Sequence, residues 1–114
     1  MRTLNQGDED DTYASFYKSI RLACTAINSL NGYRVKNQQG HHYLTIEVAA
    51  QLMNGELKEI FEKIRRMRVK RNNVDYDFFN VSKEELLNAE KYAEAILKKV
   101  YSLINADKKQ QGLL

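Results

Sequence analysis

A run of cations is the part of the chain best suited to chemistry, because six of the nine residues 63–71 are Lys or Arg. The planar guanidinium group of arginine binds phosphate through parallel hydrogen bonds. Cations also suit the last turns of a helix, where they offset the negative end of the backbone dipole. This second interpretation, a solvated helix end, accounts for Arg65, Arg66 and Lys70.

The two remaining arginines of the run, Arg68 and Arg71, do not fit a solvated helix end. They continue the helical spacing of an apolar stripe, so they fall on or beside the face expected to be core. A charge on such a face is costly unless it is paired or lines a site. Two interpretations therefore stay open: ion pairs with acids such as Asp75 or Asp77, or a site that binds phosphate.

Two adjacent histidines, His41 and His42, follow a glycine at a predicted helix start. Neighbouring side chains point in different directions on a helix, and the positions four residues further on hold Thr45 and Ile46, so the spacing forms no metal pair. The sequence also contains no glycine-rich phosphate loop, dinucleotide fingerprint, zinc-protease motif or nucleophile elbow. We expect no metal and no cofactor, and assign a single histidine to acid–base or hydrogen-bonding work.

Aromatic residues follow the basic run: Tyr76, Phe78 and Phe79. Exposed rings stack on nucleic-acid bases, whereas buried rings would close the end of a helical bundle. We favour burial for the phenylalanines and leave both interpretations open for Tyr76. The single cysteine, Cys24, lies on an apolar stripe and is expected to be a packed core thiol rather than a nucleophile.

Four predicted helices position these candidate residues. Apolar spacing predicts helices over about 10–30, 41–53 and 56–71. A fourth helix starts at Ser82, where Glu85 completes a capping box. Strand signals are nearly absent, so the expected fold is all-α. We expect an antiparallel up-down bundle of four helices, with a five-helix bundle as the alternative.

Smaller features refine these four helices. Asn-Gly pairs at 31–32 and 54–55 mark two of the helix ends. On the second helix, Tyr43 or Leu44 is expected to share the core face with Val48 and Leu52. The chain divides into a polar arm (1–11), a helical domain (12–106) and a flexible tail (107–114).

Length and composition limit the class of protein. The 114 residues suit one domain, and the single cysteine excludes an intramolecular disulfide framework. No stretch is apolar enough to span a membrane, and the acidic N-terminus does not resemble a signal peptide, so we expect a cytoplasmic protein that does not bind membranes. The net charge of +3 is small but concentrated, because residues 32–80 hold nine basic and six acidic side chains.

Several short motifs in a fixed order resemble those of the HEPN superfamily (higher eukaryote and prokaryote nucleotide-binding domain), in what looks like a small bacterial branch. The resemblance covers roughly residues 12–105. The matching segments are Gly32-Tyr33-Arg34, Gly40-His41-His42, the stretch from Arg65 to Asn72 with Tyr76, and Val81 to Glu85 at the start of the last helix. The resemblance implies a four- or five-helix bundle that is commonly a homodimer. Many members are metal-independent endoribonucleases of toxin–antitoxin, phage-defence or RNA-processing systems.

The catalytic signature of the family is Arg, usually a polar residue, a short spacer and then His. Arg71 and Asn72 match its first part, but Tyr76 stands where the histidine is expected. A tyrosine with a pKa near 10 is a poor acid or base at neutral pH. Tyr76 can orient a group, Arg68 or Arg71 can stabilise developing charge, and His42 or His41 can supply the imidazole if the second helix packs beside the third.

The predicted site follows from this resemblance and from the basic run. The catalytic candidates are Arg68, Arg71, Asn72, Tyr76 and His42, and the candidates for nucleic-acid binding are Arg34, Arg65, Arg66 and Lys70. Three hypotheses remain: a toxin-like ribonuclease with an antitoxin partner, a non-catalytic module that binds nucleotide, RNA or a partner protein, and a helical assembly protein whose arginines pair with acids at a dimer interface.

Overall fold

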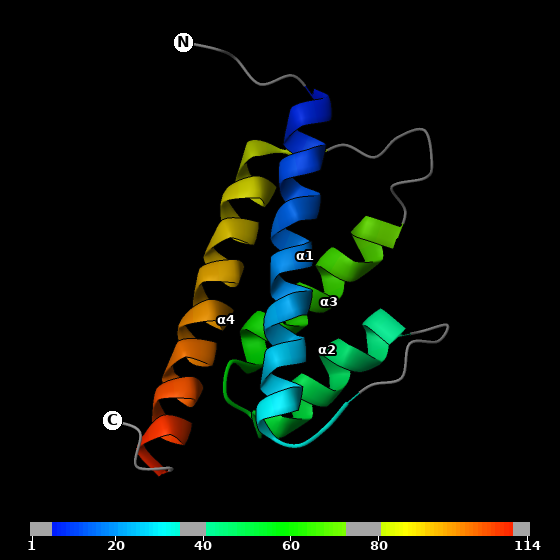
Figure 1. Cartoon of the computed structure of the whole chain (residues 1–114). Coiled ribbons are helices and arrows are strands. Elements are labelled where there is room, and N and C mark those ends of the chain that lie inside the picture. Colours follow the sequence, from blue (N-terminus) through cyan, green and yellow to red (C-terminus); the bar gives the residue numbers. More distant parts are fainter. Residues whose placement is uncertain (1–5, 35–40, 73–80, 111–114) are drawn as a thin grey trace.

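The protein is all-helical throughout the part that the structure describes. This computed structural model describes the backbone of residues 6–34, 41–72 and 81–110, and the side chains of 10–34, 43–70, 81–106 and 108. The helices are α1 (Gln6–Leu30), α2 (His41–Leu52), α3 (Lys58–Asn72) and α4 (Lys83–Gln110) (Figure 1). No strand occurs among the described residues. The all-α prediction is confirmed, and the described residues form the four helices that the sequence predicted.

Two helices are longer than the sequence suggested. α1 begins at Gln6, inside the segment assigned to a polar arm, and α4 continues to Gln110, inside the segment assigned to a flexible tail. The division into arm, domain and tail stays a prediction. None of the described helices is both long enough and apolar enough to cross a membrane.

The core lies mainly between α1 and α4, which share the most extensive contact in the fold (Figure 1). Buried side chains recur along α1 at helical spacing, and α4 presents small buried residues such as Ala89 and Ala93 to them. Small residues let two helix backbones approach closely. Further along α4, the larger residues Ile96 and Val100 are also buried. Cys24 is fully buried in this core, as predicted, and desolvation raises the pKa of its thiol from 9.0 to about 12.

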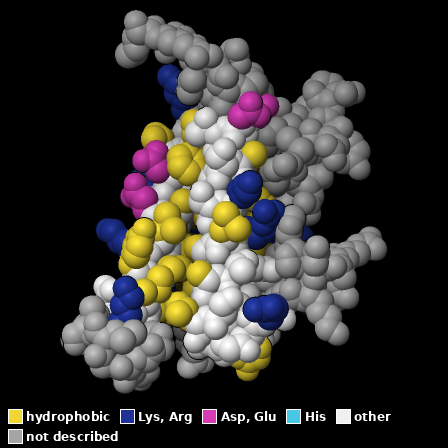
Figure 2. All heavy atoms as spheres, in the orientation of Figure 1, with side chains coloured by type: hydrophobic (Ala, Val, Ile, Leu, Met, Phe, Trp, Pro, Cys, Tyr) yellow, Lys and Arg dark blue, Asp and Glu magenta, His cyan; other side chains and the backbone are white. Residues whose placement is uncertain are grey.

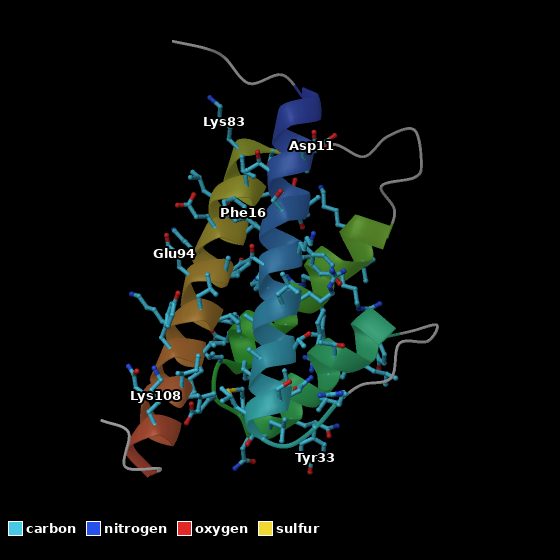
Figure 3. The ribbon with its side chains drawn as sticks, viewed as in Figure 1. Asp11, Phe16, Tyr33, Lys83, Glu94 and Lys108 are labelled. Carbon is cyan, nitrogen blue, oxygen red and sulfur yellow. The ribbon has the colours of Figure 1, made fainter. Side chains whose placement is uncertain are left out.

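The directions of the helices differ from the expected up-down order. The colours of Figure 1 show that α1 and α4 run the same way, and Figure 3 places Asp11 and Lys83 near one end of the pair and Tyr33 and Lys108 near the other. Antiparallel neighbours are expected only when connections are short. The ten residues 31–40 and the ten residues 73–82 can each span about 33 Å when extended, so neither connection forces a reversal.

An antiparallel arrangement does hold for α2 and α3. Tyr43, in the first turn of α2, contacts Arg68 near the end of α3, and Glu47 contacts Arg65 one turn further in. This hairpin packs against α1, mainly through α2. It brings the N-terminal end of α2 and the C-terminal end of α3 to the same place.

α2 buries a different face from the one expected. Ile46, Ala49 and Met53 are buried, whereas Tyr43 and Leu44 are 47% and 36% exposed. The prediction was wrong for Tyr43 and Leu44, although Leu52 does pack against the core. Apolar residues occur all round this helix, so their spacing does not select one face. Contacts with α1 make the choice: the buried Asn28 amide donates a hydrogen bond to the Thr45 carbonyl oxygen at 3.1 Å.

The predicted helix ends at the two Asn-Gly pairs are confirmed. After α1, the amide of Gly32 donates to the Ser29 carbonyl at 3.0 Å and that of Tyr33 to the Asn28 carbonyl at 2.8 Å, a Schellman motif with Gly32 at φ +80°. After α2, Asn54 and Gly55 also have positive φ angles. Their left-handed conformation turns the chain towards α3.

Specific residues also define where α3 and α4 begin. Leu57 has a φ of 60° and its carbonyl accepts the Phe61 amide at 2.9 Å, so α3 begins at Lys58, two residues later than expected. The capping box of α4 is confirmed. The Ser82 hydroxyl accepts the Glu85 amide at 3.1 Å, and the Glu85 carboxylate accepts the Ser82 amide at 3.2 Å.

Candidate nucleic-acid interface

The basic run of α3 is divided between two sides of the helix. Arg65 and Arg68, three residues apart, point towards α2, where they contact Glu47 and Tyr43. Lys63, Arg66 and Lys70 lie on another side, where they line a pocket shared with α1 and α4. Steps of three and four residues keep each group on its own face. A segment that is continuous in sequence therefore forms two chemically different surfaces.

Arg68 is held against an aromatic ring. Its guanidinium carbon lies 4.8 Å from the centre of the Tyr43 ring, a cation–π contact. Its Nε–H is buried, and no acceptor for it occurs among the described residues. A buried donor without an acceptor costs about 1–3 kcal/mol. Such a group, oriented by a ring yet still able to donate, has the properties of an anion-binding arginine.

The alternative for Arg68, an ion pair, finds no partner in the described part of the chain. None of the carboxylates described there forms a salt bridge with it. The two acids named from the sequence, Asp75 and Asp77, lie outside the described residues.

Arg65 is paired rather than freely solvated. Its Nε donates to Glu47 Oε2 at 2.6 Å and its Nη2 to Oε1 at 3.0 Å, so the fork of the guanidinium meets both carboxylate oxygens. The hydrogen bonds to Glu47 raise the pKa of Arg65, although burial opposes this change. The solvated-end interpretation was wrong for this residue, because a carboxylate from the neighbouring helix neutralises it.

Lys70 is also paired. Its ammonium group lies 2.6 Å from Oε2 of Glu85, the residue that caps α4. Burial alone would raise the pKa of the Glu85 carboxyl, but hydrogen bonds from Lys70 and Ser82 hold this pKa below its usual value. Arg66 differs from both, since it is exposed and forms no salt bridge with the described residues. Only Arg66 of the three matches the predicted solvated cation.

A pocket of about 240 Å³ lies where α3 meets α1 and α4. Its cationic wall comes from α3, and its other walls combine aromatic, amide and carboxylate groups. The lining residues are Tyr13, Lys63, Arg66, Met67, Lys70, Glu85, Asn88 and Tyr92. Sequence reasoning missed Tyr13, Asn88 and Tyr92, because the two tyrosines sit at helical positions that look like ordinary core. Desolvation, followed by the charge of Glu85, raises the pKa of Tyr13 to about 12, so its phenol stays neutral.

The family model for the HEPN domain matches residues 1–106. The chain belongs to the HEPN family. No curated protein and no solved structure matches it. HEPN domains are helical, in agreement with the four helices formed by the described residues, and the family often has ribonuclease activity.

The motif residues of this HEPN domain lie at the open end of the α2–α3 hairpin, where α2 begins and α3 ends. The backbones of Arg71 and Asn72 form the last turn of α3, and those of His41 and His42 form the first turn of α2. Their side chains, and the whole of Tyr76, lie outside the described residues. The contact between Tyr43 and Arg68 shows that these two helix ends are neighbours.

One predicted nucleic-acid contact lies apart from the others. Arg34 is exposed just beyond the end of α1. Its sequence neighbour Tyr33 sits at the end of the bundle away from the C-terminus of α3 (Figure 3). Its assignment to nucleic-acid binding stays a prediction. No group of three or more metal-ligating side chains occurs among the described residues of the HEPN domain.

Proposed function

We propose that this HEPN domain is a metal-independent endoribonuclease. It binds RNA where the N-terminal end of α2 lies beside the C-terminal end of α3. One observation carries the proposal: Arg68, held by the Tyr43 ring with a buried Nε–H that meets no acceptor among the described residues. The backbones of the motif residues 71–72 and of the histidines 41–42 approach the same end of the hairpin. The family match supports the choice of substrate.

The proposed reaction is attack of a ribose 2′-oxygen on the adjacent phosphorus. The new P–O2′ bond forms as the P–O5′ bond breaks, leaving a 2′,3′-cyclic phosphate and a 5′-hydroxyl. A base takes the proton from the 2′-hydroxyl, and an acid gives a proton to the departing 5′-oxygen. We assign proton transfer to His42, stabilisation of the charge on the phosphoryl oxygens to Arg68 and Arg71, and positioning of the phosphate to Asn72 and Tyr76.

Binding of the RNA strand is assigned to cations on both sides of α3, with Arg65 next to the proposed centre and Arg66 and Lys70 on the other side. Arg66 is exposed and contributes directly, whereas Arg65 and Lys70 exchange a carboxylate partner for phosphate. Each phosphate contact releases counterions from the nucleic acid, so affinity falls as salt concentration rises. A shallow dependence of affinity on salt would contradict this role.

The test uses purified protein and a structured RNA in the presence of a chelator. We expect the wild-type protein to cleave the RNA, and Arg71→Ala and Arg68→Ala to lose at least about 100-fold in rate, as when one donor to a developing charge is removed. Lys58→Ala is the matched control, since it removes an exposed cation from the start of the same helix. No cleavage by any form of the protein, or equal cleavage by Arg71→Ala, would reject the ribonuclease.

The second candidate function is a non-catalytic HEPN module that holds RNA or nucleotide on the same arginines. It is favoured by Tyr76, which stands where the family places its acid–base histidine. In this case the protein binds RNA in a salt-sensitive manner, Arg71→Ala weakens binding, and no product forms. Binding and cleavage measured on the same samples separate the two functions.

We further infer that the protein acts as a cytoplasmic homodimer and a toxin-like member of a toxin–antitoxin or phage-defence system, with an antitoxin as partner. Figure 2 shows hydrophobic side chains gathered along the α1–α4 side of the molecule. Leu22 of α1 and Leu87, Leu97 and Tyr101 of α4 are all more than a third exposed. An exposed apolar stripe is typical of an interface, and a two-fold axis pairs it with its copy.

Two measurements test these inferences. Leu97→Glu should convert a dimer into a monomer in light scattering, whereas Leu44→Glu, at a comparably exposed leucine on α2, should not. Induced expression of the wild-type chain should arrest bacterial growth, and expression of Arg71→Ala should not. A wild-type monomer, or growth arrest by both chains, would contradict the respective inference.

A further inference from the structure

The pocket between α1, α3 and α4 lies on a different side of α3 from the proposed catalytic centre, so the reaction does not account for it. Its floor includes two buried side chains, Tyr13 and Met67. Its rim is charged and open to solvent, because Lys63 and Arg66 are exposed. A buried floor inside a polar rim is the arrangement found where one protein anchors a side chain of another.

The charges of the pocket favour an occupant that carries carboxylates. Lys63 and Arg66 form no salt bridge with any residue described in the structure. Lys70 binds Oε2 of Glu85 at 2.6 Å, which shows that a carboxylate fits against this wall. The described lining therefore keeps two positive charges without a partner. An ammonium and a guanidinium group each form charge-assisted hydrogen bonds with a carboxylate.

The size of the pocket favours a single side chain over a whole small molecule. Its volume is about 240 Å³, whereas ordinary small-molecule pockets begin at roughly 300 Å³. One large side chain held by a protein surface fits this space, as at the anchor positions of protein interfaces. Met67 and Tyr92 offer it a thioether and a ring. Burial, followed by the charge of Glu85, raises the pKa of Tyr13 to about 12, so this phenol adds no negative charge.

We propose that this pocket is a docking site for an acidic segment of a partner protein, in which two carboxylates flank one aromatic or large aliphatic side chain. That side chain enters the pocket against Met67 and Tyr92, and the two carboxylates pair with Lys63 and Arg66. The Asn88 amide both donates and accepts hydrogen bonds, so it can bind the backbone of the segment. The opposite charges of segment and pocket also speed association, most strongly at low salt concentration.

Docking of the segment is independent of RNA cleavage. Arg66 is shared with the proposed RNA contacts, whereas Lys63 has no role in the reaction or in RNA binding, so Lys63 separates the two functions. A protein that cleaves RNA but ignores acidic peptides would overturn the docking site alone. A protein that binds acidic peptides but cleaves nothing would overturn the ribonuclease alone.

The test is fluorescence anisotropy of the full chain with a short labelled peptide centred on Glu-Phe-Glu. Two matched peptides serve as controls: Gln-Phe-Gln lacks the carboxylates, and Glu-Ala-Glu lacks the large side chain. We expect Glu-Phe-Glu to bind and both controls to bind far more weakly. No binding of Glu-Phe-Glu at about 1 mM peptide, or equal binding of either control, would overturn the proposal.

Variants of two lysines on α3 assign the binding to the pocket. Lys63→Gln should weaken binding of Glu-Phe-Glu about tenfold, the effect of losing one charge-assisted contact. Lys58→Gln, at an exposed lysine that does not line the pocket, should leave binding unchanged. An unchanged affinity in Lys63→Gln would reject the docking site.

A further variant fills the pocket without changing its charge. Asn88→Trp places a large ring at a lining position on α4, so it should abolish peptide binding while circular dichroism shows an intact helical fold. Peptide binding that survives Asn88→Trp in the folded protein would place the segment elsewhere and reject the pocket.

Two other occupants of the pocket predict different results for Lys63→Gln. With RNA in the pocket, this change weakens RNA binding more than peptide binding. With a second copy of the chain in the pocket, it converts a dimer into a monomer in light scattering. We expect neither result, and either one would overturn the proposed partner.

Discussion

The guanidinium group of Arg68 lies over the Tyr43 ring, 4.8 Å from its centre, and this contact joins the end of α3 to the start of α2. Tyr43 directly follows the histidine pair, and Arg68 lies three residues before the Arg-Asn motif. Because Tyr43 is 47% exposed, the contact is partly solvated and modest in energy. Its importance lies in the orientation that it gives to a phosphate-binding group.

Replacement of Tyr43 tests this role. Tyr43→Leu removes the ring and should lower the free energy of unfolding by about 0.5–1 kcal/mol. The rate of RNA cleavage or the RNA affinity should fall by more than this energy accounts for, because Arg68 is no longer held in place. Tyr43→Phe keeps the ring and should restore most of both properties. Tyr101→Leu, at an exposed tyrosine of α4, serves as the control. Urea denaturation and RNA titration on the same samples give the comparison.

The Glu47 carboxylate should affect stability and RNA binding in opposite directions. Glu47→Gln removes a bidentate partner of Arg65, whose side chain is 40% exposed, so we expect a loss of no more than about 1 kcal/mol in unfolding free energy. The same change removes a negative charge and frees a guanidinium, so RNA affinity should rise. Glu59→Gln, on the exposed surface of α3, removes an equal charge without breaking this pair. A fall in RNA affinity with Glu47→Gln would show that Arg65 acts only as a structural residue.

Alkaline pH should destabilise the fold through two buried groups. Burial raises the pKa of Cys24 from 9.0 to about 12 and that of Tyr13 from 10.0 to about 12. Both folded-state values lie above the unfolded ones, so ionisation favours the unfolded chain once pH exceeds the unfolded values. The contribution of these two groups to the unfolding free energy should be flat below about pH 9 and fall between about pH 9 and 12.

Two measurements isolate the cysteine. In Cys24→Ala the contribution of this pair of groups should begin to fall about one pH unit later, because Tyr13, with an unfolded pKa of 10.0, is then the remaining member of the pair. A thiol reagent at neutral pH should label wild-type Cys24 only after denaturant unfolds the protein, since the side chain is fully buried. Fast labelling of the native protein would contradict the buried position.

The end of α1 depends on a residue that tolerates a left-handed backbone. Gly32 has a φ of +80°, and its amide closes the last turn on the Ser29 carbonyl. Gly32→Ala should lower the free energy of unfolding by about 1 kcal/mol. Nothing lies within 4 Å of an added Cβ, so this loss would come from the backbone rather than from a clash. Gly32→Asn should cost less, because asparagine adopts this conformation more readily, and thermal melting of the two variants checks the order.

Local chemistry explains why several features of the fold could be read in advance. The Ser82–Glu85 capping box depends on residues three positions apart, and the turns after α1 and α2 depend on adjacent Asn and Gly. Cys24 lies on an apolar stripe long enough to identify its face. Each of these features involves neighbours within one or two helical turns, so the sequence by itself determined them.

Contacts between distant segments required the tertiary structure. Glu47 lies 18 residues from Arg65, and no local pattern names it as the partner. Apolar residues occur all round α2, so the sequence did not indicate which face enters the core. The connections between helices are long, so the sequence did not determine the relative directions of α1 and α4. The sequence contains the concentrated basic run and predicted the helix on which it lies. Only packing decided that Arg65 and Arg68 face α2 while Lys63, Arg66 and Lys70 line a separate pocket, because the neighbours of each face come from other helices.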